Sequence, residues 1–262
     1  MRKQVLLLIG VGGALACNKT AQSHPKGWDW FGTHDDQVYS YVLLSANQVT
    51  DKSDTDSYQI SVSAAFIDSN TNTLHAIGNL SVENRTITRN VDNSYSYGYG
   101  NPSDLQEAMS LFGRNVMIQV NGESPGDTVT ATVYLPKKIV KLISDFPDSV
   151  ASAKDVTLSW EPDNQYIWGQ VVLQVYYYPS LSRARDPGLP QNIKPLNFTV
   201  PDNGNYILHA TDLNHFPANA YIGISIARGS QNLASLPLSK RRIYFFSSSS
   251  ASTLPLLVTV GY

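Results

Sequence analysis

Short runs rich in Val, Ile, Thr, Tyr and Phe follow one another along most of this 262-residue chain, separated by clusters of Gly, Asn, Asp, Pro and Ser. β-Branched and aromatic residues favour strands, and the residues between the runs favour turns. In several runs apolar residues alternate with polar ones. Val156, Leu158 and Trp160, for example, fall on one face of an extended segment. The pattern predicts an all-β fold.

The runs place the expected strands at residues 38–44, 58–67, 74–82, 115–120, 128–135, 156–160, 170–178, 196–200, 206–209, 221–227, 242–246 and 255–260. Helix is scarce, and the best candidate is 104–111, where apolar residues recur on one face. Pro201-Asp202-Asn203-Gly204 supplies a fixed φ, side-chain hydrogen bonding and a positive-φ position. Residues 197–208 are therefore expected to form a hairpin.

The length of the chain suits two ordinary domains, each with its own core. Antiparallel sheets with one buried face need a covering layer, which a sandwich or a barrel supplies. We predict two antiparallel β-sandwich domains, an N-terminal one at 28–150 and a C-terminal one at 151–262. The charge is consistent with this division, because residues 17–150 hold 9 basic and 15 acidic side chains and residues 151–262 hold 8 and 6.

The single cysteine, Cys17, stands at the end of a short export signal. A basic start precedes a 12-residue apolar run at 5–16, and small residues surround the cleavage point. Ala14-Leu15-Ala16-Cys17 resembles a lipobox, with Ala in the position where Leu is usual. The alternatives are a secretory signal with a chance cysteine, or a membrane span, which needs about 20 apolar residues. We expect a signal peptide at 1–16 and a lipidated, flexible tether at 17–27.

Two features of the second half concern its architecture. Trp160 ends an early strand with inward-facing alternation, and Tyr206 precedes a turn at Asp212-Leu213. On these features the segment 151–262 resembles an immunoglobulin or fibronectin type III-like β-sandwich. A chain with one cysteine lacks the core disulfide of antibody domains, so the resemblance implies an architecture and no particular function.

The whole arrangement, a lipobox followed by β-sandwich modules, is similar to the cell-envelope lipoproteins of Bacteroidota. That resemblance implies attachment to the outer membrane through the N-terminal lipid. Some of those lipoproteins carry an acidic run after the lipidated cysteine as a signal for surface export. Here residues 18–22 read Asn-Lys-Thr-Ala-Gln, without an acid. The comparison therefore favours the periplasmic face over the cell surface.

The sequence contains no recognisable catalytic motif. A nucleophile elbow, a zinc-binding histidine pair, a phosphate-binding loop and a dinucleotide fingerprint are absent, so no catalytic residue, metal ligand or cofactor is assigned. Oxygen ligands cluster at 51–56 and 68–72, but such residues are also typical of exposed turns. His209 and His215 are close in sequence and are expected at the surface. With 17 basic and 21 acidic side chains after residue 16, nucleic acid is not an expected partner.

Three tyrosines, Tyr95, Tyr97 and Tyr99, are the candidate ligand-binding residues. They alternate with Ser and Gly, so an extended chain places all three on one face. A flat aromatic strip can stack on sugar rings or anchor a protein partner. An inward-facing row would have the same pattern, and a core role is therefore the alternative.

Together these features predict a lipid-anchored cell-envelope protein that acts by non-catalytic binding or assembly, with a glycan or an envelope protein as partner. A competing hypothesis is a β-sandwich hydrolase acting on polysaccharide, which needs two carboxyl groups roughly 5 to 10 Å apart. Its candidate acids are Glu83, Glu107, Glu123 and Glu161. A third hypothesis is a small outer-membrane barrel, suggested by the C-terminal segment 256–262, which ends on an aromatic residue.

Overall fold

The computed structural model describes residues 40–50, 57–68, 71, 73–98, 102–139, 149–166 and 169–260. Strand makes up 54% and helix 8%, which confirms the all-β prediction. The strands are β1 (Ser40–Thr50), β2 (Ser57–Ala65), β3 (Ile67–Asp68), β4 (Thr73–Leu74), β5 (Leu80–Val82), β6 (Arg85–Ile87), β7 (Tyr95–Gly98), β8 (Arg114–Asn121), β9 (Thr128–Leu135), β10 (Ser149–Ala151), β11 (Val156–Ser159), β12 (Gln170–Tyr177), β13 (Leu196–Pro201), β14 (Asn205–Leu208), β15 (Tyr221–Ser235), β16 (Arg242–Thr253) and β17 (Leu256–Thr259).

In the described part of the chain three short helices connect these strands: α1 (Pro102–Met109), α2 (Pro179–Arg185) and α3 (Ala210–Leu213). Within the described ranges, none of the helices has the length and apolar character needed to cross a membrane. Helix α1 confirms the helix expected at 104–111, with its start two residues earlier. Helices α2 and α3 were not expected from the sequence.

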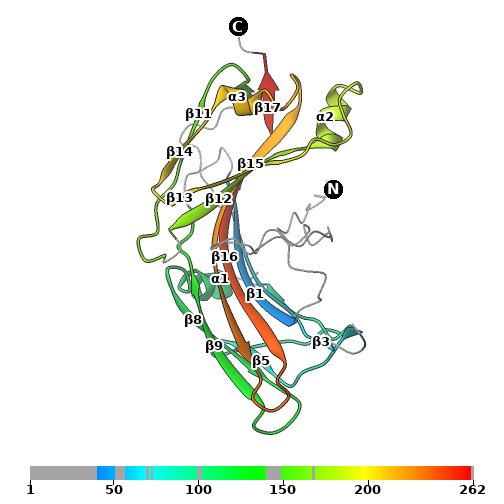
Figure 1. The fold of residues 1–262 in the computed structure, drawn as a ribbon, viewed down its shortest axis with the longest axis vertical. Helices are drawn as coiled ribbons and strands as arrows, with labels where there is room; N and C mark the ends of the chain where they lie inside the picture. The colour runs from blue at the N-terminus through cyan, green and yellow to red at the C-terminus, as the bar shows by residue number, and fades with distance from the viewer. Residues whose placement is uncertain are drawn as a thin grey trace.

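A nine-stranded sheet runs through the length of the molecule and curves, so that the ribbon in Figure 1 has the outline of a crescent. Its order is β10-β17-β15-β16-β1-β2-β7, with β12 paired to the first part of β15 and β13 paired to β12. The pairs β1 with β16 and β10 with β17 are parallel, and the other pairs in this sheet are antiparallel.

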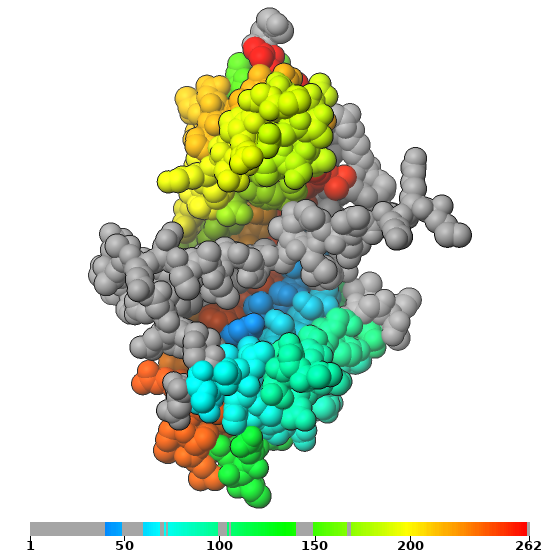
Figure 2. Space-filling view, turned by 90° about the vertical axis from the view of Figure 1, so that its right-hand side faces the viewer, coloured from blue at the N-terminus to red at the C-terminus, as the bar shows by residue number. Residues whose placement is uncertain are grey.

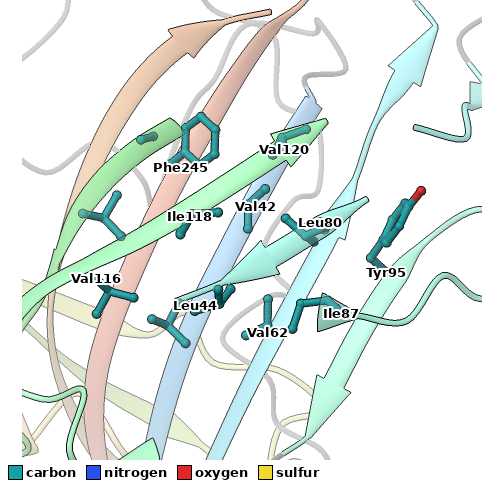
Figure 3. Packing of buried hydrophobic residues seen from close by; sticks show 14 of the residues in the cluster. Val42, Leu44, Val62, Leu80, Ile87, Tyr95, Val116, Ile118, Val120 and Phe245 are labelled. Atoms are coloured by element: carbon teal, nitrogen blue, oxygen red, sulfur yellow. The ribbon is translucent and has the colours of Figure 1, made fainter. Parts of the chain in front are cut away.

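In the lower half of Figure 1 a second sheet, β6-β5-β8-β9, covers one face of the long sheet. Val42 and Leu44 of β1, Ile118 of β8 and Phe245 of β16 point into the space between the sheets (Figure 3), and each is fully buried. Burial of such a side chain contributes about 1.5 to 3 kcal/mol. We call this cluster the first core. Its members are Val42, Leu44, Ala46, Ile60, Val62, Ala64, Phe66, Ile77, Leu80, Val82, Ile87, Tyr95, Ala108, Leu111, Val116, Ile118, Val120, Ala131, Val133, Leu135, Leu236, Ile243 and Phe245.

The upper half holds a separate apolar cluster, the second core. Here β13-β12-β15-β17-β10 of the long sheet face the two-stranded sheet β11-β14 and the short helix α3. Members of the second core are Ile139, Val150, Leu158, Trp160, Val171, Leu173, Val175, Tyr177, Val200, Leu208, Leu213, Phe216, Ala220, Ile222, Ile224, Ile226, Ala251, Leu256 and Val258.

The β15–β16 hairpin contributes to both cores. On β16, Phe245 belongs to the first core and Ala251 to the second; on β15, Ile224 belongs to the second core. The predicted strands at 221–227 and 242–246 are therefore too short, because β15 continues to Ser235 and β16 to Thr253. The serine-rich part of β16 has no apolar alternation, but it pairs with β1 on one side and β15 on the other. The domain boundary at residue 150 stays a prediction, and residues from beyond it complete the first core.

A buried polar cluster, which we call the joint, separates the two cores. It contains Tyr134, Asp163, Asp202, Arg228, Ser230 and Ser247. Arg228 is fully buried; its Nη1 donates to Asp202 Oδ2 at 2.7 Å and its Nη2 to the carbonyl of Glu161 at 2.8 Å. Trp160 Nε1 donates to the other oxygen of Asp202 at 2.7 Å. The charge of Arg228 is thus matched by one carboxylate, which is itself hydrogen-bonded.

The other side of the joint is built around Tyr134 of β9. Its hydroxyl donates to both carboxylate oxygens of Asp163, at 3.0 and 2.9 Å, and burial, with this bond, raises the pKa of Tyr134. Its carbonyl accepts the hydroxyls of Ser230 at 2.7 Å and Ser247 at 2.5 Å. The joint therefore connects β9 to both strands of the shared hairpin.

The prediction of a hairpin at 197–208 is wrong. The turn is present, with Gly204 at a φ of 90° that favours glycine, but β13 pairs with β12 whereas β14 pairs with β11. The turn carries the chain from the long sheet to the two-stranded sheet β11-β14. Asp202 within the turn is bound by Trp160 and Arg228 of the joint region. Turn chemistry identifies a chain reversal and leaves the partner of each strand undetermined.

The strand expected at 74–82 is interrupted. Only β4 and β5 form within it, and Gly78 between them donates its N–H to the carbonyl of Asn121 at 3.0 Å. A Cβ at Gly78 would lie 2.7 Å from the carbonyl oxygen of Gly122, so this close approach requires glycine.

Candidate functional site

Tyr95, the first of the candidate tyrosines, lies in the first core and is 2% exposed. Its ring packs edge-on against Phe66 with a centroid separation of 5.6 Å. Its hydroxyl donates to the carbonyl of Ile77 at 2.9 Å and accepts the N–H of Ile77 at 3.2 Å. Tyr95 has the core role that the sequence left as the alternative, and it is not accessible to a ligand at the surface.

Tyr97 lies on the same edge strand, β7, and takes part in a cluster that closes the side of the first core. Arg85 of β6 donates to the Tyr97 hydroxyl and lies over its ring, 4.9 Å from the centroid. The Tyr97 hydroxyl donates to Asp104 at 2.9 Å. Arg85 also binds Asp104 at 3.2 Å and Glu107, both on α1. Burial, followed by the bond to Asp104, raises the pKa of Tyr97.

This cluster has a structural role. The contacts of Arg85 join β6 of one sheet, β7 of the other and helix α1, whose Ala108 is buried in the first core. A planar guanidinium with carboxylate partners and a ring beneath it is a stable arrangement. Tyr97 is therefore engaged on its hydroxyl and on one face of its ring.

Several predicted site residues lie outside the described residues. They are Cys17, Tyr99, the acidic cluster at 51–56 and the asparagines at 70 and 72. The lipidation of Cys17 stays a prediction, as does the role of Tyr99.

The four glutamates lie beside four different cationic or basic side chains: Glu83 beside Arg114 at 3.5 Å, Glu107 beside Arg85, Glu123 beside His75 at 3.2 Å and Glu161 beside Lys137 at 3.6 Å. Glu107 shares Arg85 with Asp104, and the guanidinium between these two carboxylates offsets part of their charge. These contacts give each glutamate its own partner and bring no two glutamates together.

The two histidines also have separate partners. His209 Nδ1 lies 3.2 Å from Asp155 Oδ2, and His215 Nε2 lies 2.9 Å from the carbonyl of Lys194. Among the residues that the structure describes, no group of three or more His, Cys, Asp or Glu side chains is arranged to hold a metal ion.

A shallow surface pocket that is open to solvent lies beside helix α2, and the sequence did not predict it. Its lining residues are Pro179, Ser180, Arg183, Gln191 and Asn192. Pro179 and Arg183 are four residues apart and share a face of the helix, while Gln191 and Asn192 come from the segment that returns toward β13. Figure 1 shows α2 standing away from the long sheet on the concave side of the crescent, and Figure 2 shows this segment in yellow and yellow-green across the upper half.

Helix α2 is held in place by Ser182, which is fully buried. The Ser182 hydroxyl donates to the carbonyl of Tyr178 at 2.7 Å and accepts the N–H of Tyr221 at 2.8 Å, which joins α2 to the start of β15. Proline at the first helical position favours the helix start, because its φ is already helical and it has no N–H to satisfy.

The segment that contains Gln191 and Asn192 is also fixed by contacts with the fold. The Tyr177 hydroxyl donates to the carbonyl of Pro190 at 2.9 Å, directly before the pocket residues, and Ile193 packs on the second core directly after them. Asp186 shapes the reversal by accepting the N–H of Gly188 at 3.0 Å. Both walls of the pocket are therefore fixed by the fold, while the polar groups that line it point to solvent.

The lining chemistry favours ligands with oxygen acceptors. Arg183 offers five N–H donors in a planar fork, and the amides of Gln191 and Asn192 each offer donors and an acceptor. Among the described residues that line the pocket none carries a carboxylate, and Arg185, in the last turn of the same helix, is not one of them. A proline at the first helical position followed by two arginines was the available sequence signal for this element.

No protein-family model matches the chain, and a search of curated proteins finds no match.

Proposed function

We propose that this protein is a lipid-anchored component of the bacterial cell envelope that binds a hydroxyl- and carboxylate-bearing ligand, an acidic glycan, in the pocket beside α2. The observation that carries the proposal is the lining of Arg183, Gln191, Asn192 and Ser180 on walls fixed by the core. Bidentate pairing of arginine with a carboxylate, together with amide contacts to hydroxyls, is a common basis of polar ligand recognition. Binding is the whole of this role, with no reaction assigned.

The envelope location rests on the signal at 1–16 and on Cys17. A multiply acylated cysteine is a stable membrane anchor, since each buried methylene contributes about 0.8 kcal/mol. We assign the protein to the periplasmic face of the outer membrane, because no acidic run follows Cys17. Mass spectrometry of the mature N-terminus tests this assignment: diacyl or triacyl mass on Cys17 supports it, and an unmodified N-terminus contradicts it.

The second core belongs, in this proposal, to an immunoglobulin-like domain. Its support is the strand order, with β13-β12-β15-β17-β10 in one sheet and β11-β14 in the other. In the immunoglobulin plan the strands C′, C, F and G share one sheet and B and E lie in the other, the same pattern in the same chain order. The pocket then lies in the connection between strands C and C′.

Glycan binding is tested with the mature protein on a panel of neutral and uronic-acid-containing oligosaccharides. We expect binding to the acidic members only, with a loss of tenfold or more on Arg183→Ala, as is usual for removal of a charged hydrogen-bond donor. Arg185→Ala is the matched control, because it removes the same charge from the same helix outside the pocket lining. Equal binding by the parent protein and Arg183→Ala would contradict the proposal.

A further inference from the structure

The turn that closes the β15–β16 hairpin is rigidly held. Leu236 donates its N–H to the carbonyl of Arg241, and Lys240 donates to the carbonyl of Leu236, each at 3.0 Å. Asp127, from the β8–β9 turn, is 3% exposed, and its Oδ1 accepts the N–H of Leu238 at 2.7 Å and that of Ser239 at 3.4 Å. The carboxylate of Asp127 is thus directed at the backbone of the turn, and it also attracts the charge of Arg241.

The side chains that the turn presents are apolar and basic. Leu238 is 60% exposed, Lys240 and Arg242 are exposed, and Arg241 is half-buried between them. The other acidic residue of the neighbouring β8–β9 turn, Glu123, is paired with His75 at 3.2 Å. We call residues 238–242 the basic tip.

The basic tip lies at the end of the fold where the N-terminal part of the chain enters. β1 and β16 are parallel, and their register places Ser40, the first described residue, beside Ile243, directly after the tip. Cys17 precedes Ser40 by 23 residues, so the predicted lipid and the basic tip are connected through the same end of the first core.

We infer that the basic tip contacts the anionic phospholipid headgroups of the membrane in which the lipid is anchored. The inference rests on the proposed lipidation, because Ser40, the first described residue after Cys17, lies at this end of the molecule. Lysine and arginine near an anionic surface each strengthen binding by about fivefold, and an exposed leucine adds apolar contact at the headgroup boundary. A lipid and a basic patch together give a more persistent attachment than a lipid alone.

The experiment uses the mature chain with Cys17→Ser, which removes the lipid and leaves the tip as the membrane contact. Sedimentation with vesicles of 30% phosphatidylglycerol in phosphatidylcholine is compared with pure phosphatidylcholine. We expect binding to the anionic vesicles that weakens with added salt, and about a 25-fold loss on K240Q/R242Q, which retains Arg241 beside Asp127. Leu238→Ser is expected to weaken binding by a smaller factor.

The matched control is K154Q/R185Q, which removes the same charge from exposed positions elsewhere in the chain and is expected to bind as the parent does. Equal binding by K240Q/R242Q and the control, with thermal unfolding showing both folded, would overturn the inference, as would no binding of the parent to anionic vesicles. The lipid state of Cys17, measured by mass spectrometry, is independent of this result. Failure of the tip and failure of the proposed anchor are therefore distinguished.

Discussion

Phe245 and Ser247 stand two residues apart on the same face of β16, but they enter different surroundings. Phe245 is fully buried in the first core, where contact with apolar neighbours is non-directional. Ser247 is as deeply buried in the joint, where its hydroxyl must have a partner and donates to the carbonyl of Tyr134. Strand β16 thus passes from a region that is stabilised by burial of apolar surface to a region where directional hydrogen bonds are required.

The difference assigns separate roles to the cores and the joint. A buried ion pair such as Arg228 with Asp202 loses much of its Coulombic gain to desolvation, so its net contribution to stability is small. Arg228 Nε, moreover, has no hydrogen-bond partner among the described residues. The joint nevertheless accepts few alternative arrangements, because its other donors are directed at particular acceptors, as Arg228 Nη1 and Trp160 Nε1 are at Asp202. We expect the cores to provide stability and the joint to fix how the cores sit relative to each other.

The largest effect is expected from a cavity in the first core. Phe245→Ala should lower the free energy of unfolding by about 3 to 5 kcal/mol, through lost burial and the void that remains. Because the β15–β16 hairpin also completes the second core, amides of β12 should lose hydrogen-exchange protection by a similar amount, although β12 contributes to the second core alone. Hydrogen exchange followed by mass spectrometry measures both regions in one sample.

Leu173→Ala, a cavity in the second core on β12 itself, is the reciprocal control and should deprotect β8 of the first core. If Phe245→Ala leaves the β12 amides as protected as in the parent, the two cores unfold independently and the shared hairpin does not couple them.

A smaller effect is expected from the joint. Arg228→Met removes the cation and leaves the Asp202 carboxylate buried, at a cost of about 3 kcal/mol. Replacing both partners, as Arg228→Met with Asp202→Asn, should recover part of that loss, because no unpaired charge remains and the amide oxygen can still accept the N–H of Trp160. Urea unfolding of the two variants gives the comparison.

The outcome separates the two roles. Recovery of stability by the double variant, with broadened or shifted amide resonances at β9 and β15, is expected if the joint specifies geometry. A double variant as unstable as Arg228→Met alone would mean that the ion pair itself is a main source of stability.

The apolar cores were more predictable from the sequence than the joint was. Alternation at 128–135 predicts β9 with its observed bounds, and the alternating isoleucines of β15 all face the second core. Alternation is a local signal, so it locates strands reliably. The same signal fails at Ser247–Ser250, because these small polar residues are buried in β16 by partners that come from elsewhere in the chain.

The candidate site was less predictable for the same physical reason. The spacing of Tyr95 and Tyr97 indicates a shared face in a strand, but burial depends on which sheet that face meets, and Tyr95 meets the first core. The pocket beside α2 combines the helix with residues 191 and 192, and its position depends on Tyr177 and Ser182, whose long-range contacts no spacing reveals.

The smallest effect concerns an exposed contact, at Asp155, in contrast to the buried joint. Asp155 Oδ1 accepts the N–H of Ala210 at 2.8 Å, and this bond, together with His209, holds the pKa of Asp155 below its ordinary value of 3.8. A carboxylate whose pKa is lowered by folding becomes protonated at a lower pH in the folded state than in the unfolded state. Its stabilisation is therefore present above pH 3.8 and is lost as the pH falls through the folded value.

We expect the start of α3 to loosen in that acidic range, while the joint and the cores retain their protection. Amide exchange at Ala210 between pH 5 and pH 2.5, corrected for its intrinsic pH dependence, measures the change. Asp155→Asn should remove this pH dependence, since an amide does not titrate, and leave exchange in β12 unchanged. If Asp155→Asn and the parent lose protection at Ala210 in parallel, another carboxylate controls this end of the second core, and the nearest in sequence, Asp212, whose Oδ2 accepts the N–H of His209 at 3.1 Å, becomes the group to test.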